Sequence, residues 1–358
     1  MKDGMNARER MWAAINRKPV DRIPTDIWAT GEVMEKLKEH FGCEAQAVRE
    51  CLHVDGFGGV GPVACPPSPP PGWRGDPVWG MENKPVAYEG GVYYEQSHYP
   101  LAYAQTVDDL MRHRWPQAEW FDFSGVREAA KAAHEARVVQ AGYMAPFFYH
   151  NLTRGLEQSL MDPLMDPEFT HVLLEKLTAY FLAYHRKLFE AADGFIDVCQ
   201  VTDDLGSQTG PMIGLDLYRA FYKPCHKKMI DLCKEFGVKV FHHDDGSCRE
   251  FLPDLVEMGI DILNPVQWNC PGMETEGLKR DFGQKVCFHG GIENQRILPF
   301  GTPEEVRAEV RHCIDTLASD GTGYILAPCH NLQPNTPVEN IIAMYDEAYH
   351  YGKKRLAK

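Results

Sequence analysis

The feature that most constrains the fold is a regular alternation of strand-like and helix-like segments in the second half of the chain. Short apolar runs alternate with longer segments whose apolar residues recur at helical spacing. The apolar runs span about 138–148, 195–202, 238–242, 261–266, 285–289 and 323–328, and the helical patterns span about 155–192, 215–236, 249–258, 303–318 and 337–352. This alternation predicts a parallel sheet with crossover helices. A (β/α)8 barrel and an open doubly wound sheet both have this pattern, and we favour the barrel.

The first third of the chain is less regular. We expect helices over residues 6–16, 32–41 and 45–51, and a first barrel strand over 23–28. Residues 66–71 read Pro-Pro-Ser-Pro-Pro-Pro, which predicts a stiff loop. Aromatic and β-branched residues from Trp79 to Tyr94, with Glu89-Gly90-Gly91 among them, indicate a hairpin that could act as a lid. We therefore interpret residues 1–358 as one α/β domain with an insertion over about 60–120 beside the barrel mouth.

Acidic and imidazole side chains recur where the apolar runs end. The run 238–241 leads into His242, His243, Asp244 and Asp245, and the other runs lead into Asp203 and Asp204, into His289, and into Cys329, His330 and Asn331. In a parallel barrel the carboxyl ends of the strands carry the chemistry, so these side chains should converge on one pocket. The pattern is typical of an enzyme.

Charge and composition limit the partners. The net charge is -14 and no basic run is present, which argues against a nucleic-acid partner. No run of 18 or more apolar residues suggests a membrane span, and the charged start, residues 1–10, is unlike a signal peptide, so we expect a cytoplasmic protein. The 11 Cys residues form no Cys-x-x-Cys pair, which suits reduced thiols.

Several segments resemble the uroporphyrinogen decarboxylase superfamily. They are Asn6-Ala-Arg-Glu-Arg with Lys18-Pro-Val-Asp-Arg-Ile-Pro24, Lys239-Val-Phe-His-His-Asp-Asp-Gly246 with Leu252-Pro-Asp-Leu and Leu263-Asn-Pro-Val-Gln267, and Tyr324-Ile-Leu-Ala-Pro-Cys-His-Asn331 with Thr336-Pro-Val-Glu-Asn340. The resemblance covers nearly the whole chain and implies a (β/α)8 barrel and a homodimer. The superfamily includes the haem-pathway decarboxylase and zinc-dependent methyltransferases that exchange methyl groups with a corrinoid protein or a thiol. Fold transfers across such a family more safely than function.

The chain departs from the decarboxylase pattern. That pattern has an arginine-rich segment that pairs with propionates, whereas residues 25–32 here contain no Arg. Asn151 and Gly214 stand where a tyrosine and a serine are expected, and only His330 and Asp55 match family residues. A substrate with many carboxylates would then leave buried anions unpaired, at on the order of several kcal/mol each. The resemblance therefore favours the methyltransferase branch.

In the methyltransferase branch, zinc is held by a His-x-Cys pair and a later Cys. Alignment on Leu252-Pro-Asp-Leu places His243 on the family histidine and Asp245 on the first cysteine, with His330 at or beside the later one. Residues two apart on a strand point the same way, so His243 and Asp245 could share a metal with His330. Nitrogen and oxygen donors suit zinc and also iron, manganese or cobalt. Cys329 is an alternative late ligand.

The remaining candidates have both functional and structural interpretations. Asp203 or Asp204 could transfer a proton or could cap the loop 205–210. Asn264, Gln267 and Asn331 could orient a substrate, and His289 could bind substrate or be a hydrogen-bonded structural histidine. His242 and Asp244 face the other side of the strand. We expect these to be structural.

These residues lead to one main hypothesis and two alternatives. The main hypothesis is a metal-dependent methyltransferase that acts on a small methylated substrate. No segment resembles the corrinoid-binding Asp-x-His-x-x-Gly motif, so any corrinoid would come from another polypeptide. One alternative is a metal-free decarboxylase or lyase in which His330 and Asp55 stabilise a protonated intermediate. The other is a non-catalytic binding barrel.

Overall fold

A curled sheet of parallel strands forms the centre of the molecule. The computed structural model describes residues 4–88 and 91–356. Its main sheet has the order β1-β6-β7-β8-β9-β10-β11, and every neighbouring pair is parallel. The strands are β1 (Phe57–Gly59), β6 (Val138–Met144), β7 (Val198–Val201), β8 (Lys239–His243), β9 (Ile262–Asn264), β10 (Cys287–Ile292) and β11 (Tyr324–Pro328). Strand order follows chain order, as in a barrel.

The segment predicted as the first barrel strand does not form a regular strand. Thr25 makes a single parallel bridge to Leu326 of β11, and the Thr25 carbonyl accepts the backbone N–H groups of Asp55 and Gly56, next to β1. The segment thus joins the two edges of the seven-stranded sheet. Pro24 has no N–H to donate, which explains why the pairing stays this short. The α/β barrel class is confirmed, with this irregular segment in the eighth position.

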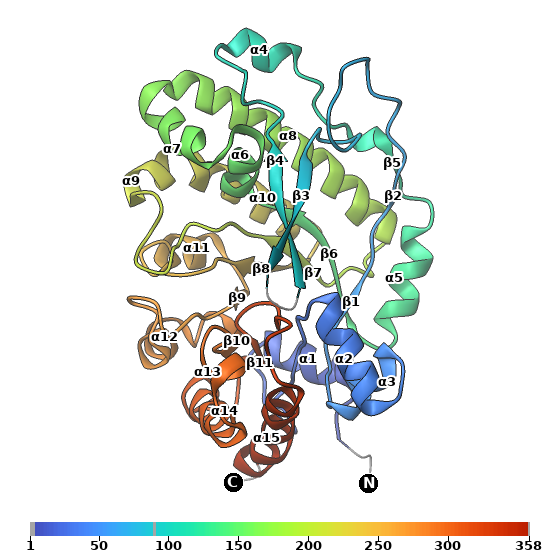
Figure 1. Cartoon of the computed structure of the whole chain (residues 1–358), viewed down its shortest axis with the longest axis vertical. Coiled ribbons are helices and arrows are strands. Elements are labelled where there is room, and N and C mark those ends of the chain that lie inside the picture. Colours follow the sequence, from blue (N-terminus) through green and yellow to red (C-terminus); the bar gives the residue numbers. More distant parts are fainter. Residues whose placement is uncertain (1–3, 89–90, 357–358) are drawn as a thin grey trace.

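Helices surround the sheet (Figure 1). They are α1 (Ala7–Ile15), α2 (Gly31–Phe41), α3 (Ala45–Cys51), α4 (Val107–Arg112), α5 (Val126–His134), α6 (Pro146–Arg154), α7 (Leu156–Met165), α8 (Pro167–Ala192), α9 (Leu215–Leu217), α10 (Lys223–Glu235), α11 (Leu252–Met258), α12 (Thr275–Phe282), α13 (Ile297–Phe300), α14 (Pro303–Leu317) and α15 (Val338–Leu356), with short helices η1 (Ala118–Trp120) and η2 (Tyr218–Tyr222). Each segment that the sequence predicts as helical is helical, although residues 155–192 form two helices, α7 and α8, rather than one. The helices that the sequence missed include α5 and α12.

A small apolar cluster fills the bottom of the barrel and identifies the inward-facing residues. Met11, Ala14 and Ile15 of α1 pack there against one residue from each of six strands. These six are Val138, Val198, Phe241, Ile262, Cys287 and Ile325. Since side chains alternate along a strand, the next inward residue lies two positions further on. That layer contains the residues that build the site described below.

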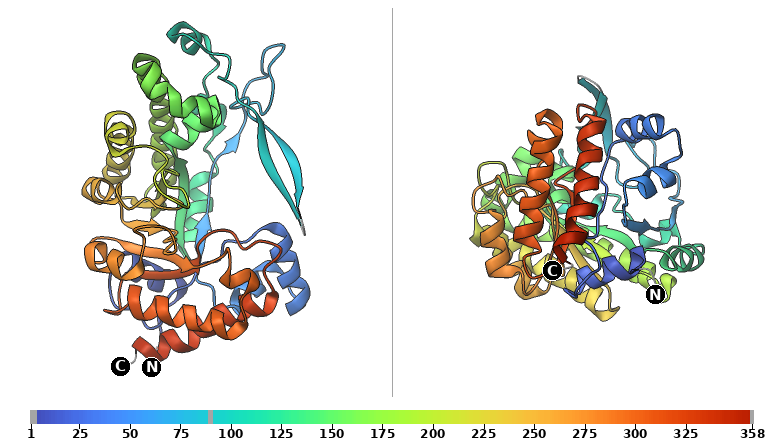
Figure 2. Two further views of the ribbon diagram at one scale, coloured as in Figure 1. Left: turned by 60° about the vertical axis from the view of Figure 1, so that its left-hand side comes forward. Right: turned by 90° about the horizontal axis from the view of Figure 1, so that it is seen from below.

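Residues 60–120 lie between β1 and β6 and contain an antiparallel hairpin. Its strands are β3 (Glu82–Tyr88) and β4 (Gly91–His98), and two shorter strands, β2 (Val63–Ala64) and β5 (Phe121–Asp122), pair beside it. The hairpin stands apart from the sheet in the side view (Figure 2). The predicted turn at Glu89-Gly90 lies outside the described residues. The Tyr88 hydroxyl donates to Gln333 Oε1 at 3.1 Å, so the hairpin reaches the loop after β11.

No helix within residues 4–88 and 91–356 is both long and apolar enough to cross a membrane. The interpretation of the whole chain as one domain stays a prediction.

Candidate metal centre

The second inward layer of the barrel is polar. Two residues beyond the apolar cluster come Gln140 on β6, Gln200 on β7, His243 on β8, Asn264 on β9 and His289 on β10. Asn264 and His289 are fully buried, and His243 is only 12% exposed. Buried polar side chains need hydrogen-bond partners, and three of these supply them to each other.

A chain of hydrogen bonds crosses the barrel interior at this level. Trp28 Nε1 donates to Asp26 Oδ2 at 3.1 Å, and His289 Nε2 lies 3.1 Å from the same oxygen. Asn264 Nδ2 lies 2.7 Å from His289 Nδ1, and Asn264 Oδ1 lies 2.5 Å from His243 Nδ1. The chain starts at the irregular segment that closes the barrel and ends at β8.

The chain determines which nitrogen of His243 is available. The NH2 group of Asn264 can only donate, so His289 Nδ1 must accept this hydrogen bond with its lone pair. The proton of the neutral His289 ring is then on Nε2, which faces Asp26. The Asn264 carbonyl oxygen only accepts, so His243 carries its proton on Nδ1. His243 Nε2 is then the nitrogen turned toward Asp204, Asp245 and His330. A histidine that ligates a metal has this arrangement, with its second nitrogen held by a protein acceptor.

The structure brings together the three residues that the sequence assigned to a metal. One ligand atom from each of His243, Asp245 and His330 lies within 4.8 Å of the other two. His243 Nε2 is 3.7 Å from Asp245 Oδ2, and His330 Nε2 is 3.8 Å from the same oxygen. His243 lies on β8, Asp245 follows it by two residues, and His330 follows β11. Strand-end geometry therefore accounts for the cluster.

These separations are too long for good hydrogen bonds, which lie at 2.7–3.2 Å. Two atoms bound tetrahedrally to one zinc ion at about 2.0–2.1 Å are roughly 3.3–3.5 Å apart. The observed distances are close to that value. Asp245 Oδ1 is also buried and has no hydrogen-bond partner among the described residues. The donor atoms and their spacing fit a divalent transition metal.

Electrostatics tie the same groups together. Burial disfavours a charged His243, but the carboxylates of Asp245 and Asp204 outweigh it and raise the pKa of His243 to about 9. Burial also disfavours a charged Asp245, yet His243 lowers the pKa of that carboxyl. Burial and the charges of Asp245 and Asp203 raise the pKa of Asp204. Asp204 Oδ1 is 3.6 Å from His243 Nε2, which suits a group that exchanges a proton beside the centre.

Asp203 is placed elsewhere, although it adjoins Asp204 in sequence. Its two carboxylate oxygens accept the backbone N–H groups of Phe147 and Phe148, at 3.1 and 2.8 Å, at the start of α6. His226 Nε2 lies 2.9 Å from Asp203 Oδ2, and both side chains are fully buried. Asp203 thus caps a helix at its positive end. The predicted cap of the loop 205–210 is not Asp203, because Asp244 accepts the N–H groups of Leu205 and Gly206 in that loop.

His242 and Asp244 point away from the barrel interior, as the strand alternation predicts. His242 Nδ1 donates to the Val201 carbonyl at 2.7 Å, and Asp244 Oδ1 accepts the N–H groups of Leu205 and Gly206. Both side chains are buried. Burial, with the nearby His226, lowers the pKa of His242 to about 3, and burial raises that of Asp244 well above its usual value.

Asp55 is not brought near His330. It is 1% exposed and precedes β1, at the amino end of that strand. Arg10 Nη1 lies 2.6 Å from Asp55 Oδ1, and Arg22 Nη1 lies 2.9 Å from Asp55 Oδ2. The carboxylate is therefore occupied by two guanidinium groups. This placement opposes the catalytic role that the resemblance suggested for Asp55.

Of the four predicted substrate-binding residues, three make hydrogen bonds within the protein and one is partly exposed. Asn264 and His289 belong to the buried chain, and Gln267 Oε1 accepts the backbone N–H of Gly246, in the loop after β8. These three hold the protein's own groups rather than facing a ligand. Asn331 is partly exposed and follows His330, so its assignment as a substrate ligand stays a prediction.

Cys329 lies close to the centre without joining it. It is 2% exposed, and Sγ donates to the Val266 carbonyl at 3.5 Å. Burial raises the pKa of this thiol well above its usual value, which favours the neutral form. His330 is thus the late donor of the cluster.

The sequence interpretation missed Asp26 and the glutamines of the inward layer. Asp26 lies inside the predicted first strand, 23–28, and Gln140 and Gln200 lie inside the predicted strands 138–148 and 195–202. The alternation rule could have found the two glutamines, because each stands two residues after an inward valine. Nothing local in the sequence links Asp26 to His289.

Comparison with known proteins gives a consistent result. The family model for uroporphyrinogen decarboxylase matches residues 92–351. A methylated-thiol–coenzyme M methyltransferase from Methanosarcina mazei is 28% identical over 203 residues, which cover 56% of this chain and 49% of that protein. A uroporphyrinogen decarboxylase from Legionella pneumophila is 28% identical over 188 residues, covering 52% and 49%. The chain spans about half the length of the curated relatives it matches.

A solved structure matches over nearly the whole chain. It is a methyltransferase from Methanosarcina mazei, with a TM-score of 0.64 and 19% sequence identity, and the match covers 96% of this chain and 98% of that one. At this identity the likeness establishes the fold alone.

Proposed function

The chain belongs to the uroporphyrinogen decarboxylase family, and we propose that it is a metal-dependent methyltransferase of that family. The observation that carries the proposal is the convergence of His243, Asp245 and His330, with His243 Nδ1 bonded to Asn264 and His243 Nε2 turned toward the other two donors. The similarity to a methyltransferase supports the choice of reaction. We propose zinc as the metal, because three nitrogen and oxygen donors leave a position open for substrate.

The bound metal would act as a Lewis acid, activating a thiol or polarising an oxygen of the substrate. The chain's own residues would prepare the site for that chemistry. Asn264 and His289 hold the His243 ring in one orientation. Asp204, whose pKa is raised by burial, would take up or release the proton of the attacking or leaving group at its carboxylate.

The partners follow from the same proposal. A small methylated molecule would bind at the barrel mouth, and the methyl group would pass to or from a thiol or a corrinoid held by another protein. The relative named for methylated thiols and coenzyme M supports a thiol partner. We also propose a homodimer, on the family resemblance alone.

The metal-free lyase is the weaker alternative. It needs His330 and Asp55 to act on one intermediate, and Asp55 is buried between Arg10 and Arg22. Unpairing that carboxylate would leave Arg22 without its counter-charge and Arg10 with Asp21 alone, at about 3–5 kcal/mol. A non-catalytic binding barrel would have no need for an aligned donor set beside a proton-exchanging carboxylate.

Elemental analysis by mass spectrometry tests the proposal. We expect about one zinc per chain in protein purified without chelators, and loss of that zinc in the His243→Ala, His330→Ala double variant. His312→Ala is the matched control, because this half-exposed histidine lies on α14 and is not among the clustered donors. Metal-free wild-type protein, or a double variant that retains full metal, would contradict the proposal.

A further inference from the structure

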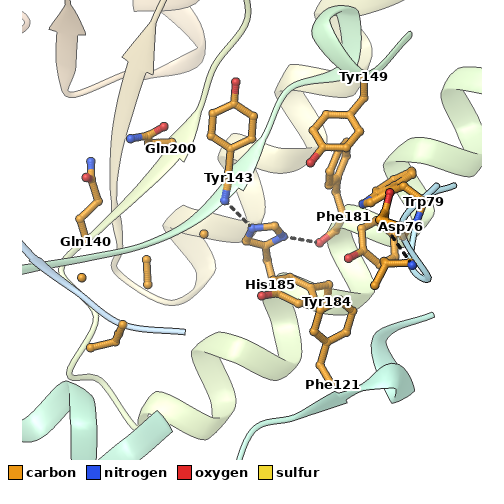
Figure 3. Close-up of a pocket in the computed structure, with 16 residues that line it drawn as sticks. Asp76, Trp79, Phe121, Gln140, Tyr143, Tyr149, Phe181, Tyr184, His185 and Gln200 are labelled. Carbon is orange, nitrogen blue, oxygen red and sulfur yellow. Dashed lines mark hydrogen bonds between the residues drawn. The ribbon is translucent and has the colours of Figure 1, made fainter. Parts of the chain in front are cut away.

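A cavity of about 570 Å³ opens at Gln140 and Gln200 of the second inward layer of the barrel. It is lined by the inward glutamines of β6 and β7, by Tyr143, and by aromatic side chains of α8 and of the 76–79 loop (Figure 3). Sites for small organic molecules have volumes of about 300–1,000 Å³. The cavity is therefore large enough for a ring-bearing ligand and larger than one methyl group needs.

Tyr143 connects the cavity with the metal centre. Its backbone pairs with Gln200 across β6 and β7, and its side chain lines the cavity. Gln200, which also lines the cavity, pairs in turn with Phe241 of β8, two residues before His243. A ligand in the cavity would thus lie beside the strand that carries His243.

Aromatic rings form one wall of the cavity. Trp79 and Tyr180 meet edge to face with ring centroids 5.1 Å apart and planes at 88°, and Tyr149 and Phe181 do so at 5.0 Å and 85°. Phe121 and Tyr184 meet at 4.8 Å and 79°. Figure 3 shows this wall opposite Gln140 and Gln200. A further aromatic ring extends such an array favourably, by about 0.5–1.5 kcal/mol for each pair beyond its buried area.

The tyrosine hydroxyls that line the cavity have no hydrogen-bond partner among the described residues. Within the described chain, no hydrogen bond joins the hydroxyls of Tyr143, Tyr149, Tyr180 or Tyr184 to another residue, and the buried Gln140 Nε2 has no partner. His185 differs, because Nε2 accepts the Tyr143 N–H and Nδ1 donates to the Phe181 carbonyl. The free hydroxyls can therefore bond polar substituents of a ligand.

The charge of the lining excludes anions. Among the described residues that line the cavity there is no Lys or Arg, and burial lowers the pKa of His185 to about 4, so that its ring is neutral. Asp76 contributes a carboxylate, which accepts the backbone N–H groups of Val78, Trp79 and Met81. A carboxylate or sulfonate in this cavity would lose its hydration without gaining a cation.

We propose that this cavity binds the methyl-bearing substrate, and that the substrate is an aromatic compound without negative charge. The inference rests on the proposed function for the identity of the ligand as a methyl donor or acceptor. The aromatic wall holds the ring, and the free hydroxyls bind its polar substituents. Gln200 lies on β7, next to β8, so the end of the ligand ring at Gln200 is the end that lies toward the metal centre.

The test measures binding by calorimetry to protein stripped of metal with a chelator, without corrinoid protein or thiol. Three matched probes are compared at pH 7.5: 4-methoxybenzyl alcohol, 4-methoxybenzoate and (4-methoxycyclohexyl)methanol. We expect the neutral aromatic alcohol to bind at least about tenfold more tightly than the anion and about threefold more tightly than the saturated ring. Equal or tighter binding of the benzoate, or no binding of the alcohol, would overturn the proposal.

Gly59 offers a variant that blocks the cavity without disturbing the fold. Phe57 packs into the barrel interior and a Cβ on Gly58 would face Ala133 and Arg137, so Gly59 faces inward again. Gly59 lines the cavity, and a Cβ there would meet nothing within 4 Å. Gly59→Phe should weaken binding of the alcohol more than tenfold.

Gly61→Phe is the matched control, because a Cβ at Gly61 also meets nothing within 4 Å and Gly61 does not line the cavity. It should bind the alcohol as the wild type does. Unchanged binding in Gly59→Phe would refute the location of the site. If Gly59→Phe fails to fold, the comparison of probes on the wild type still decides the ligand class.

Because these assays use neither metal nor methyl transfer, the two proposals can fail separately. Zinc loading with no preference among the probes would overturn only the cavity assignment. Selective binding of the neutral ring to a protein that never takes up metal would overturn only the methyltransferase.

Discussion

Replacing Asn264 with leucine should weaken metal binding without touching a proposed ligand. Asn264 is fully buried, with its oxygen 2.5 Å from His243 Nδ1 and its nitrogen 2.7 Å from His289 Nδ1. Leucine has a similar shape and no hydrogen-bonding group. Asn264→Leu therefore removes the group that orients His243 while keeping the core filled.

The size of the effect follows from the two bonds lost. The His243 N–H and the His289 lone pair are each left without a partner, and each unsatisfied buried group costs about 1–3 kcal/mol. We expect the free energy of unfolding to fall by about 2–6 kcal/mol. Loss of a protein group that orients a metal ligand typically lowers metal affinity about 10–100-fold, and we expect that range here.

Two assays on the same protein separate these effects. Urea unfolding of the metal-free protein measures stability, and zinc titration against a chromophoric chelator measures affinity. Asn340→Leu is the matched control, since Asn340 is also buried and its amide donates to the carbonyls of Leu298 and Gly301, outside the centre. The control should lose stability and keep zinc affinity within about twofold.

The reasoning would be refuted if folded Asn264→Leu bound zinc as tightly as the wild type. That result would mean that His243 needs no orienting partner, or that it is not a ligand. A loss of affinity of the same size in Asn340→Leu would also refute it, because the effect would then follow from lower stability alone.

Two further predictions concern stability. Burial raises the pKa of Glu309 to about 7 in the folded protein, above its unfolded pKa of about 4.3. The folded state therefore binds the proton of Glu309 more tightly than the unfolded state does. The resulting stabilisation of the folded state is fully present below the unfolded pKa and is lost as the pH rises through 7. Glu309→Gln keeps the oxygen that accepts two N–H groups but cannot titrate. In urea titrations, the free energy of unfolding of this variant should decline between pH 5 and 8 by about 2–4 kcal/mol less than that of the wild type. Equal declines in the two proteins would contradict this prediction. Asp55→Asn should destabilise the protein by about 3–5 kcal/mol in the same assay, because Arg10 and Arg22 lose a buried counter-charge. The amount of zinc per chain should not change. Loss of zinc from the folded variant would show that Asp55 serves the metal centre.

The main elements of the fold could be predicted because they depend on local pattern. The apolar runs before Asp203, His243 and His330 became β7, β8 and β11, and helical spacing identified α8, α10, α14 and α15. β1 was missed because two of its three residues are glycines, which have low strand propensity. The predicted first strand formed only a bridge at Thr25, since Pro24 limits the pairing.

The candidate site was predictable where strand geometry alone decides it. His243 and Asp245 are two residues apart and His330 follows another strand, so side-chain alternation and the common edge of parallel strands bring them together. The same rule cannot separate Asp203 from Asp204. Both stand at one strand end, and packing against α6 and His226 turns the first into a helix cap.

The sequence by itself determined the order of the main strands and helices and the edge of the sheet where polar side chains gather. Its net charge of -14 and lack of a basic run also argued against a nucleic-acid partner. Only the tertiary structure decided which polar groups share a partner, as in the chain from Asp26 through His289 and Asn264 to His243. It also decided that Asp55 meets two arginines and that aromatic side chains of α8 line a cavity beside β6. Periodicity reports the direction of each side chain from its own strand or helix, whereas contacts between residues distant in sequence depend on how the strands and helices pack around the closed sheet.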